Sequence, residues 1–161
     1  MVLKRETSMT DFPKLMNTFY AEAGLDPLTS DANGRYIIEL NDDDRPIFCF
    51  KNSDWMGTVY ASVVTIQPNS AKDSELIMAL LSGFTGILKS RPDVLCFDQQ
   101  NNDIVLFRRF SFKIHLYAII EDFANSLCAF RELAASNAIA GPATMPGRMS
   151  KSRITPSAIR A

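Results

Sequence analysis

The stretch that decides the fold class is Tyr36-Ile-Ile-Glu-Leu-Asn-Asp-Asp-Asp-Arg-Pro-Ile-Phe-Cys-Phe50. Its two ends, 36–40 and 46–50, are short β-branched and aromatic runs, and the acidic segment between them is typical of a solvated hairpin turn. Asp31-Ala-Asn-Gly34 precedes the first run and reads as a turn, because Asn and Gly tolerate positive φ. Residues 55–66, rich in Val, Thr and Tyr, add a third strand. The sequence therefore predicts a three-stranded antiparallel meander.

Helical spacing of apolar residues surrounds this meander. Residues 9–23 carry apolar side chains at i, i+3, i+4 and i+7 and end at Gly24, and residues 74–89 and about 115–137 repeat the pattern. Between the last two helices, 94–97 and 104–110 read as a second hairpin. The expected order is αβββαββα. This order predicts an α+β fold in which three helices flank a twisted antiparallel sheet.

The length of 161 residues suits one domain with a tail. We expect residues 1–140 to form the domain and 141–161, interrupted by Pro142, Pro146 and Pro156, to be a disordered basic tail. The formal net charge of −1 hides an asymmetry, since residues 1–140 hold 13 basic and 18 acidic residues whereas the tail holds four basic residues and no acid. Such a weak basic footprint gives no reason to expect a nucleic acid partner.

Apolar segments and cysteines indicate the compartment. No window is long and apolar enough for a signal peptide or a membrane helix, so we expect a soluble cytoplasmic protein without a membrane partner. Cys49, Cys96 and Cys128 are far apart, and each lies in an apolar run. They are expected to be reduced core thiols rather than a disulfide framework or a zinc site.

The sequence contains no catalytic constellation. His115, the single histidine, has no Ser, Cys or carboxylate at a recognisable spacing and reads as a helix-end residue. The run Asp42-Asp-Asp44 lacks the alternating ligands and the glycine of an EF-hand loop. Arg108 and Arg109 fall on opposite faces of a strand by alternation, so they form no phosphate clamp. We therefore expect no enzymatic activity, no cofactor and no metal site.

The helix at 74–89 is apolar on most of its circumference and lacks the charged face of a surface helix. A second copy of the chain would cover such a helix, and the strand that starts at 94 could join the same two-fold interface. We expect a homodimer. The residues assigned to its interface are Leu76, Leu80, Leu81, Phe84 and Val94.

These elements resemble the class I type III secretion chaperones, the Tir chaperone family. The matching pieces are Phe12-Pro-Lys-Leu-Met-Asn-Thr-Phe-Tyr-Ala-Glu-Ala-Gly-Leu25, the 31–34 turn with its strand, Pro46-Ile-Phe48, the 76–81 helix, and 94–98 followed by 104–107. The resemblance covers about residues 9–135. It implies a small, acidic, cytoplasmic bacterial homodimer that binds the N-terminal segment of a secreted effector in extended form. The resemblance further implies that binding keeps the effector soluble and export-competent without nucleotide hydrolysis, with the secretion ATPase as a further partner and a role in virulence.

Under this resemblance, the first helix and the meander would present leftover apolar side chains to the effector. The effector could dock a helix in a groove or add a strand to an exposed edge. The residues expected to bind it are Leu15, Phe19, Ile38, Phe48 and Phe50. Two other classes stay open: a regulatory module that binds a folded protein, and a small α+β enzyme, which would need a concave pocket with clustered titratable groups.

Overall fold

A computed structural model of the protein describes residues 11–40, 43–67, 71–87, 92–139 and 159–160. Helix α1 (Phe12–Ala23) leads into strands β1 (Arg35–Leu40), β2 (Asp43–Lys51) and β3 (Met56–Thr65). Helix α2 (Ala71–Ile87) is followed by β4 (Asp93–Asp98), β5 (Asp103–Ser111), helix α3 (Leu116–Ile139) and the short strand β6 (Ile159–Arg160). The first eight elements confirm the predicted αβββαββα order and the α+β class.

The strands form one antiparallel sheet in the order β4-β5-β3-β2-β1-β6. The first three strands are the predicted meander. The chain then leaves the sheet through α2 and returns at its edge, so that β5, not β4, pairs with β3 from Met56 opposite Ser111 to Thr65 opposite Asp103. In the described chain β4 has β5 as its single neighbour and is an edge strand.

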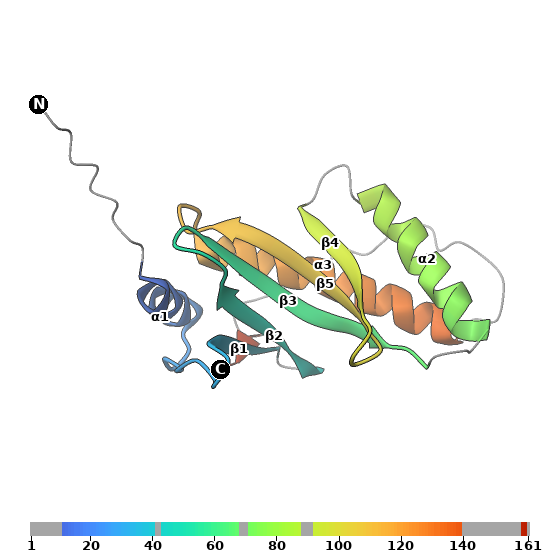
Figure 1. The fold of residues 1–161 in the computed structure, drawn as a ribbon, viewed down its shortest axis with the longest axis horizontal. Coiled ribbons are helices and arrows are strands. Elements are labelled where there is room, and N and C mark those ends of the chain that lie inside the picture. Colours follow the sequence, from blue (N-terminus) through green and yellow to red (C-terminus); the bar gives the residue numbers. More distant parts are fainter. Residues whose placement is uncertain (1–10, 41–42, 68–70, 88–91, 140–158, 161) are drawn as a thin grey trace, which may run out of the picture.

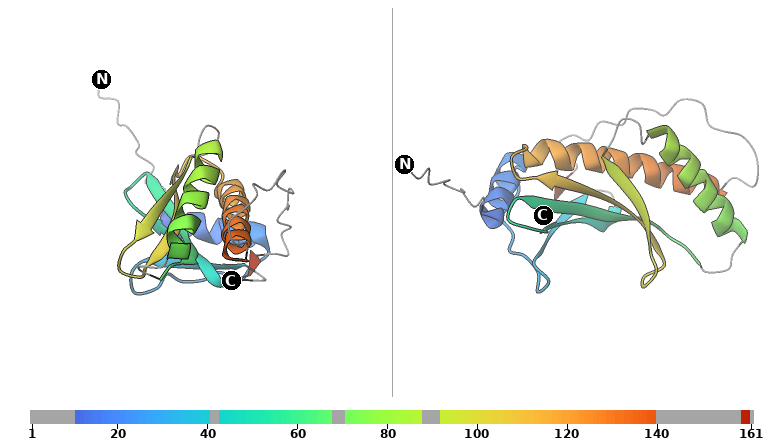
Figure 2. Two further views of the ribbon diagram at one scale, coloured as in Figure 1. Left: turned by 90° about the vertical axis from the view of Figure 1, so that its right-hand side faces the viewer. Right: turned by 45° about the horizontal axis from the view of Figure 1, so that its top comes forward.

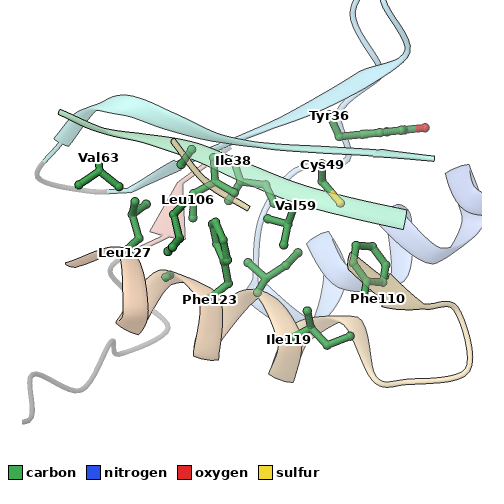
Figure 3. Close-up of a cluster of buried hydrophobic side chains, with 14 of the residues drawn as sticks. Tyr36, Ile38, Cys49, Val59, Val63, Leu106, Phe110, Ile119, Phe123 and Leu127 are labelled. Atoms are coloured by element: carbon green, nitrogen blue, oxygen red, sulfur yellow. The ribbon is translucent and has the colours of Figure 1, made fainter. Parts of the chain in front are cut away.

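The helices lie on one side of the sheet (Figure 1, Figure 2). Helix α3 runs along the sheet, α1 lies at one end and α2 at the other. Alternate side chains of the strands, among them Ile38, Val59 and Leu106, point to α3 and pack against its side chains, such as Phe123, to form the core shown in Figure 3. No described helix covers the opposite face of the sheet, which we call the open face.

Helix α1 ends where the sequence predicts. Gly24 adopts the left-handed conformation with φ of 72°, which a glycine reaches without a Cβ clash. Its N–H donates to the Ala21 carbonyl at 3.2 Å, and the N–H of Leu25 donates to the Tyr20 carbonyl at 2.8 Å. These bonds satisfy the last carbonyls of the helix and turn the chain toward β1.

One cysteine corrects the sequence expectation. Cys96 is exposed rather than buried in the core, because it lies on the edge strand β4. Cys49 is buried as expected and Cys128 is half-buried. All three are free thiols.

The structure describes most of the acidic run 41–45 but only two residues of the predicted tail. β2 begins at Asp43, so the strand takes in part of the run predicted as a turn. The predicted tail, 141–161, lies outside the described residues except for β6, whose backbone pairs with Glu39 and Leu40 of β1. In the described parts of the chain, no helix combines the length and the apolarity needed to cross a bilayer.

Candidate protein-binding surfaces

Five side chains on five neighbouring strands form a row across the open face. Direct partners in an antiparallel pair point to the same face of a sheet. The register pairs one residue on each strand with the next, and these residues, here called the apolar row, are Ile37, Phe48, Tyr60, Phe107 and Val94. Their chain neighbours Ile38, Val59 and Leu106 are buried in the core. The apolar row therefore points away from α3.

A second row runs beside the first. Arg35, Phe50, Thr58 and Arg109 are cross-strand partners in that order, and we call them the mixed row. Both rows contribute to an open groove of about 490 Å³, whose lining is completed by Asn33, Asn52, Cys96 and Val105. This volume lies within the range of ordinary ligand sites, about 300–1,000 Å³.

Aromatic contacts fix one wall of the groove. The rings of Phe48 and Tyr60 stack with centroids 5.1 Å apart, and Phe50 meets Tyr60 edge-on at 5.8 Å. The Arg35 guanidinium lies 4.9 Å from the centre of the Phe48 ring and donates a hydrogen bond to the Tyr60 hydroxyl at 3.0 Å. Such contacts hold the rings in place, so the wall is formed before any partner arrives.

Asp31 neutralises the Arg35 side of the groove. Its carboxylate accepts hydrogen bonds from the backbone N–H of Arg35 at 2.9 Å and from Nε of the same residue at 2.8 Å. These bonds hold the pKa of Asp31 below its ordinary value of 3.8. The carboxylate is therefore ionised at neutral pH and pairs with the guanidinium.

Helix α2 and strand β4 lie at the same end of the molecule (Figure 1) and carry further exposed apolar side chains. Four of the seven large hydrophobic residues that are exposed in the described chain belong to α2 and β4. They are Met78, Leu81, Val94 and Phe97, and we call them the α2–β4 surface. Val94 also belongs to the apolar row, because it is opposite Phe107, whereas Phe97 is opposite the buried Ile104 and points to the other face of β4. Large exposed apolar side chains at one end of a molecule are candidates for an interaction site.

The structure separates the residues predicted for the dimer interface. Leu81 and Val94 are exposed, at 45% and 41%, and lie on the α2–β4 surface. Leu76 and Leu80 point into the core of the chain itself, which leaves them unavailable to a partner. Phe84 lies within α2, and its side chain is outside the described residues.

The residues predicted to bind an effector are separated in the same way. Phe48 and Phe50 are half-buried on the open face, in the apolar and the mixed row. Leu15 is half-buried against the core, while Phe19 and Ile38 are fully buried in it. Of the five predicted residues, Phe50 lines the groove, and Phe48 lies beside it on the open face, stacked on Tyr60.

Sequence reasoning missed most of the groove. Tyr60, Phe107 and Arg109 enter it because β3 and β5 are neighbours, which no local pattern announces. One signal was available: in 104–107 every residue is apolar, so one of the two faces must carry apolar side chains away from the core. On β5 that outward pair is Val105 and Phe107.

The titratable groups of the described chain make contacts that a structural role explains. No three His, Cys, Asp or Glu side chains in the described ranges are placed to hold a metal ion. His115 lies just before α3, as predicted, and its Nε2 is 3.0 Å from a carboxylate oxygen of Glu22 on the exposed surface. Burial raises the pKa of the Cys49 thiol, which keeps it protonated. The distinctive surfaces of this molecule are therefore apolar ones.

Comparison with known proteins identifies the family. A sequence profile of the Tir chaperone protein (CesT) family matches residues 14–132, most of the chain. The chain belongs to the Tir chaperone protein (CesT) family. This membership confirms the resemblance found in the sequence and makes the protein a chaperone of the type III secretion class. No curated protein sequence matched the chain.

Solved structures show the same fold at low identity. The HopA1-SchA chaperone-effector complex contains a chain that is 13% identical, with a TM-score of 0.59 over 75% of this chain and 93% of that one. A chain of the ExsC-ExsE complex is 15% identical, with a TM-score of 0.56 over 78% and 91%. The Yersinia pestis type III secretion chaperone SycH, in complex with a fragment of YscM2, is 9% identical, with a TM-score of 0.53 over 74% and 99%. The CesT-family chain thus spans nearly the whole length of each of these folds.

Proposed function

We propose that this protein binds the N-terminal segment of a secreted effector in extended form and keeps it soluble and competent for export, without catalysing a reaction. The observation that carries the proposal is the apolar row. It crosses five strands, or about 19 Å at a strand spacing of about 4.8 Å. Aromatic and aliphatic side chains lie there on a face that no described helix covers.

An unfolded segment is the partner that this surface suits. Its apolar side chains lie free rather than inside a core of their own, so they can pack against the side chains of the apolar row. The segment stays extended because the chaperone surface replaces the core it would otherwise form. Two of the similar folds come from the HopA1-SchA chaperone-effector complex and from the ExsC-ExsE complex. Both are complexes with a second protein, which supports a protein partner for this chain.

The absence of catalysis is part of the same proposal. The lining of the groove, as far as the chain is described, contains no histidine, lysine or carboxylate that could act as a general acid or base. Family membership points the same way, since the family is one of chaperones.

A homodimer formed through the α2–β4 surface completes the proposal. Met78, Leu81 and Phe97 are 62%, 45% and 52% exposed, and β4 has a backbone edge, unpaired with any described strand, on which a second copy can pack. A stable interface buries about 800 Å² on each partner, which a helix and an edge strand together can provide. We place the dimer in the bacterial cytoplasm, with the secretion ATPase as a further partner.

Co-expression with the genes next to its own tests the function. Mass spectrometry of the purified complex identifies the bound protein, and hydrogen exchange of that protein locates the bound segment. We expect a secreted protein whose N-terminal segment is protected only in the complex. A partner that binds through a folded domain would favour a regulatory module instead, and a protein that retains no partner would contradict the proposal.

A further inference from the structure

We infer that the groove selects effector segments in which an acidic residue stands two positions from an apolar residue. The inference rests on the proposed function and specifies the chemistry of the segment. It comes from Arg109 and Thr58, which are directly opposite each other on β5 and β3 and both line the groove.

Arg109 carries a positive charge that nothing in the described chain neutralises. Its side chain is exposed, and no described carboxylate lies within ion-pair distance of it. The other guanidinium of the groove, on Arg35, is held by Asp31 at 2.8 Å. Residues 1–140 hold more acidic than basic residues, 18 against 13, yet the groove is positive at Arg109. Charge complementarity therefore favours an anionic group on the partner.

Thr58 adds a second polar group without a partner. Its side chain is 6% exposed, and its hydroxyl oxygen has no hydrogen bond within the described chain. Phe50 and Arg109 flank it on the neighbouring strands. Since a buried hydroxyl without a partner is unfavourable, an acceptor atom that reaches it is stabilised. A carboxylate satisfies both groups, because it accepts from the guanidinium and from the hydroxyl.

The spacing of the selected residues follows from β5. Phe107 and Arg109 are alternate residues of this strand, so their side chains share a face and lie about 6.8 Å apart. An extended segment aligned with β5 has the same spacing between its own alternate side chains. It can place an apolar side chain against Phe107 and Tyr60 while its carboxylate meets Arg109 and Thr58. The order apolar-x-acidic or acidic-x-apolar depends on the direction of the segment.

Fluorescence anisotropy with the full-length protein tests the inference. Three short labelled peptides share a Gly/Ser background and carry the core Leu-Ser-Asp, Leu-Ser-Asn or Ser-Ser-Asp. We expect Leu-Ser-Asp to bind about tenfold more tightly than either of the others. Leu-Ser-Asn lacks the carboxylate, and charge-assisted hydrogen bonds are stronger than neutral ones. Ser-Ser-Asp lacks the apolar side chain that packs against Phe107 and Tyr60. Arg109→Gln should abolish the preference for Asp over Asn. The control Lys113→Gln, an exposed cation outside the groove, should leave it unchanged.

Several results would overturn the inference. One is equal affinity of the wild type for the Leu-Ser-Asp and Leu-Ser-Asn peptides, and another is an equal loss of affinity for both peptides in Arg109→Gln. A third is complete displacement of the peptide by inorganic phosphate alone. The fourth is a change of oligomeric state in Arg109→Gln without peptide. The last would make the groove an interface between copies. The captured effector separates this inference from the proposed function: if it binds wild type and Arg109→Gln equally, the selectivity is wrong and the chaperone function stands. If wild type retains no effector, the proposed function itself fails.

Discussion

Arg108 on β5 and Asp93 on β4 form a two-point ion pair inside the protein. Nε of Arg108 donates to Oδ1 of Asp93 at 2.6 Å, and Nη2 donates to Oδ2 at 2.8 Å. The remaining Nη1 donates to Asp122 on α3 at 2.8 Å. Burial alone would lower the pKa of Arg108, but the hydrogen bonds and charges of the two carboxylates raise it overall. The charged guanidinium therefore ties the edge strand β4 to the core.

Removing the buried partner of this pair should be costly. Asp93→Ala leaves a buried guanidinium without its main acceptor, and we expect the free energy of unfolding to fall by about 3–5 kcal/mol. Asp122→Ala is the matched control: its side chain is 50% exposed, so solvent screens the pair and the loss should be about 1 kcal/mol or less. Urea denaturation measures both. Equal losses would contradict the assignment of Asp93 as the principal partner.

Gly57 is needed for close packing against Phe110. The two residues are cross-strand partners, and a Cβ on Gly57 would lie 2.9 Å from two atoms of the Phe110 ring. We expect Gly57→Ala to lower the free energy of unfolding by about 1–3 kcal/mol through overpacking. The penalty should shrink in a Phe110→Leu background, where the ring is absent. The same penalty in both backgrounds, measured by chemical denaturation, would show that the ring is not its cause.

Stability should decline at alkaline pH. Burial raises the pKa of the Cys49 thiol and of the Tyr20 hydroxyl above their ordinary values of 9.0 and 10.0. Above these values the unfolded chain has released protons that the folded chain still holds, so rising pH favours unfolding. Each group contributes a slope of up to about 1.4 kcal/mol per pH unit.

The variant Cys49→Ala isolates one of these two groups. Loss of the packing of the Cys49 side chain lowers the free energy of unfolding by the same amount at every pH. Loss of the titrating thiol instead removes the decline that starts near pH 9.0. Urea denaturation from neutral pH to above 10.0 distinguishes the two effects by the shape of the curve. Parallel curves for wild type and variant would count against a titrating Cys49.

The proposed dimer predicts a contrast between two equally exposed residues. Phe97 on the α2–β4 surface is 52% exposed, and Ile114, outside that surface, is 53% exposed. Phe97→Asp should weaken the dimer by about 2 kcal/mol or more, as expected of an interface anchor, while Ile114→Asp should leave it intact. Sedimentation velocity across a concentration series gives the two dissociation constants. A monomeric wild type would refute the dimer.

The open face predicts a matching contrast for effector capture. Phe107→Ser removes an aromatic side chain that the apolar row and the groove share and should reduce the amount of co-purified effector by about tenfold or more. Trp55→Ser changes a side chain that is 66% exposed and lies outside the groove, so capture should be unaffected. Circular dichroism confirms that both variants are folded, and Phe48→Ser provides a second test if Phe107→Ser is not. Capture that persists in both open-face variants would place the effector elsewhere.

Local features were predictable because they depend on residues close together in the chain. The glycine stop at Gly24 and the opposite faces of Arg108 and Arg109 follow from backbone conformation and side-chain alternation. Family membership was also predictable, since the spacing of apolar positions carries the resemblance. Phe48 and Phe50, predicted to bind the effector, lie on the open face, and their role in binding stays a prediction.

The sequence by itself determined the order of elements, the α+β class and the family. The tertiary structure alone decided which strands are neighbours and which apolar residues remain uncovered. Leu80, Phe19 and Ile38 satisfy the same periodicities as Leu81 and Phe48, yet the former are buried and the latter are accessible. The return of β4 at the sheet edge brings β5 beside β3 and thereby sets Arg109 opposite Thr58. Periodicity reports the faces of one element, whereas pairing over long sequence separations decides what each face meets.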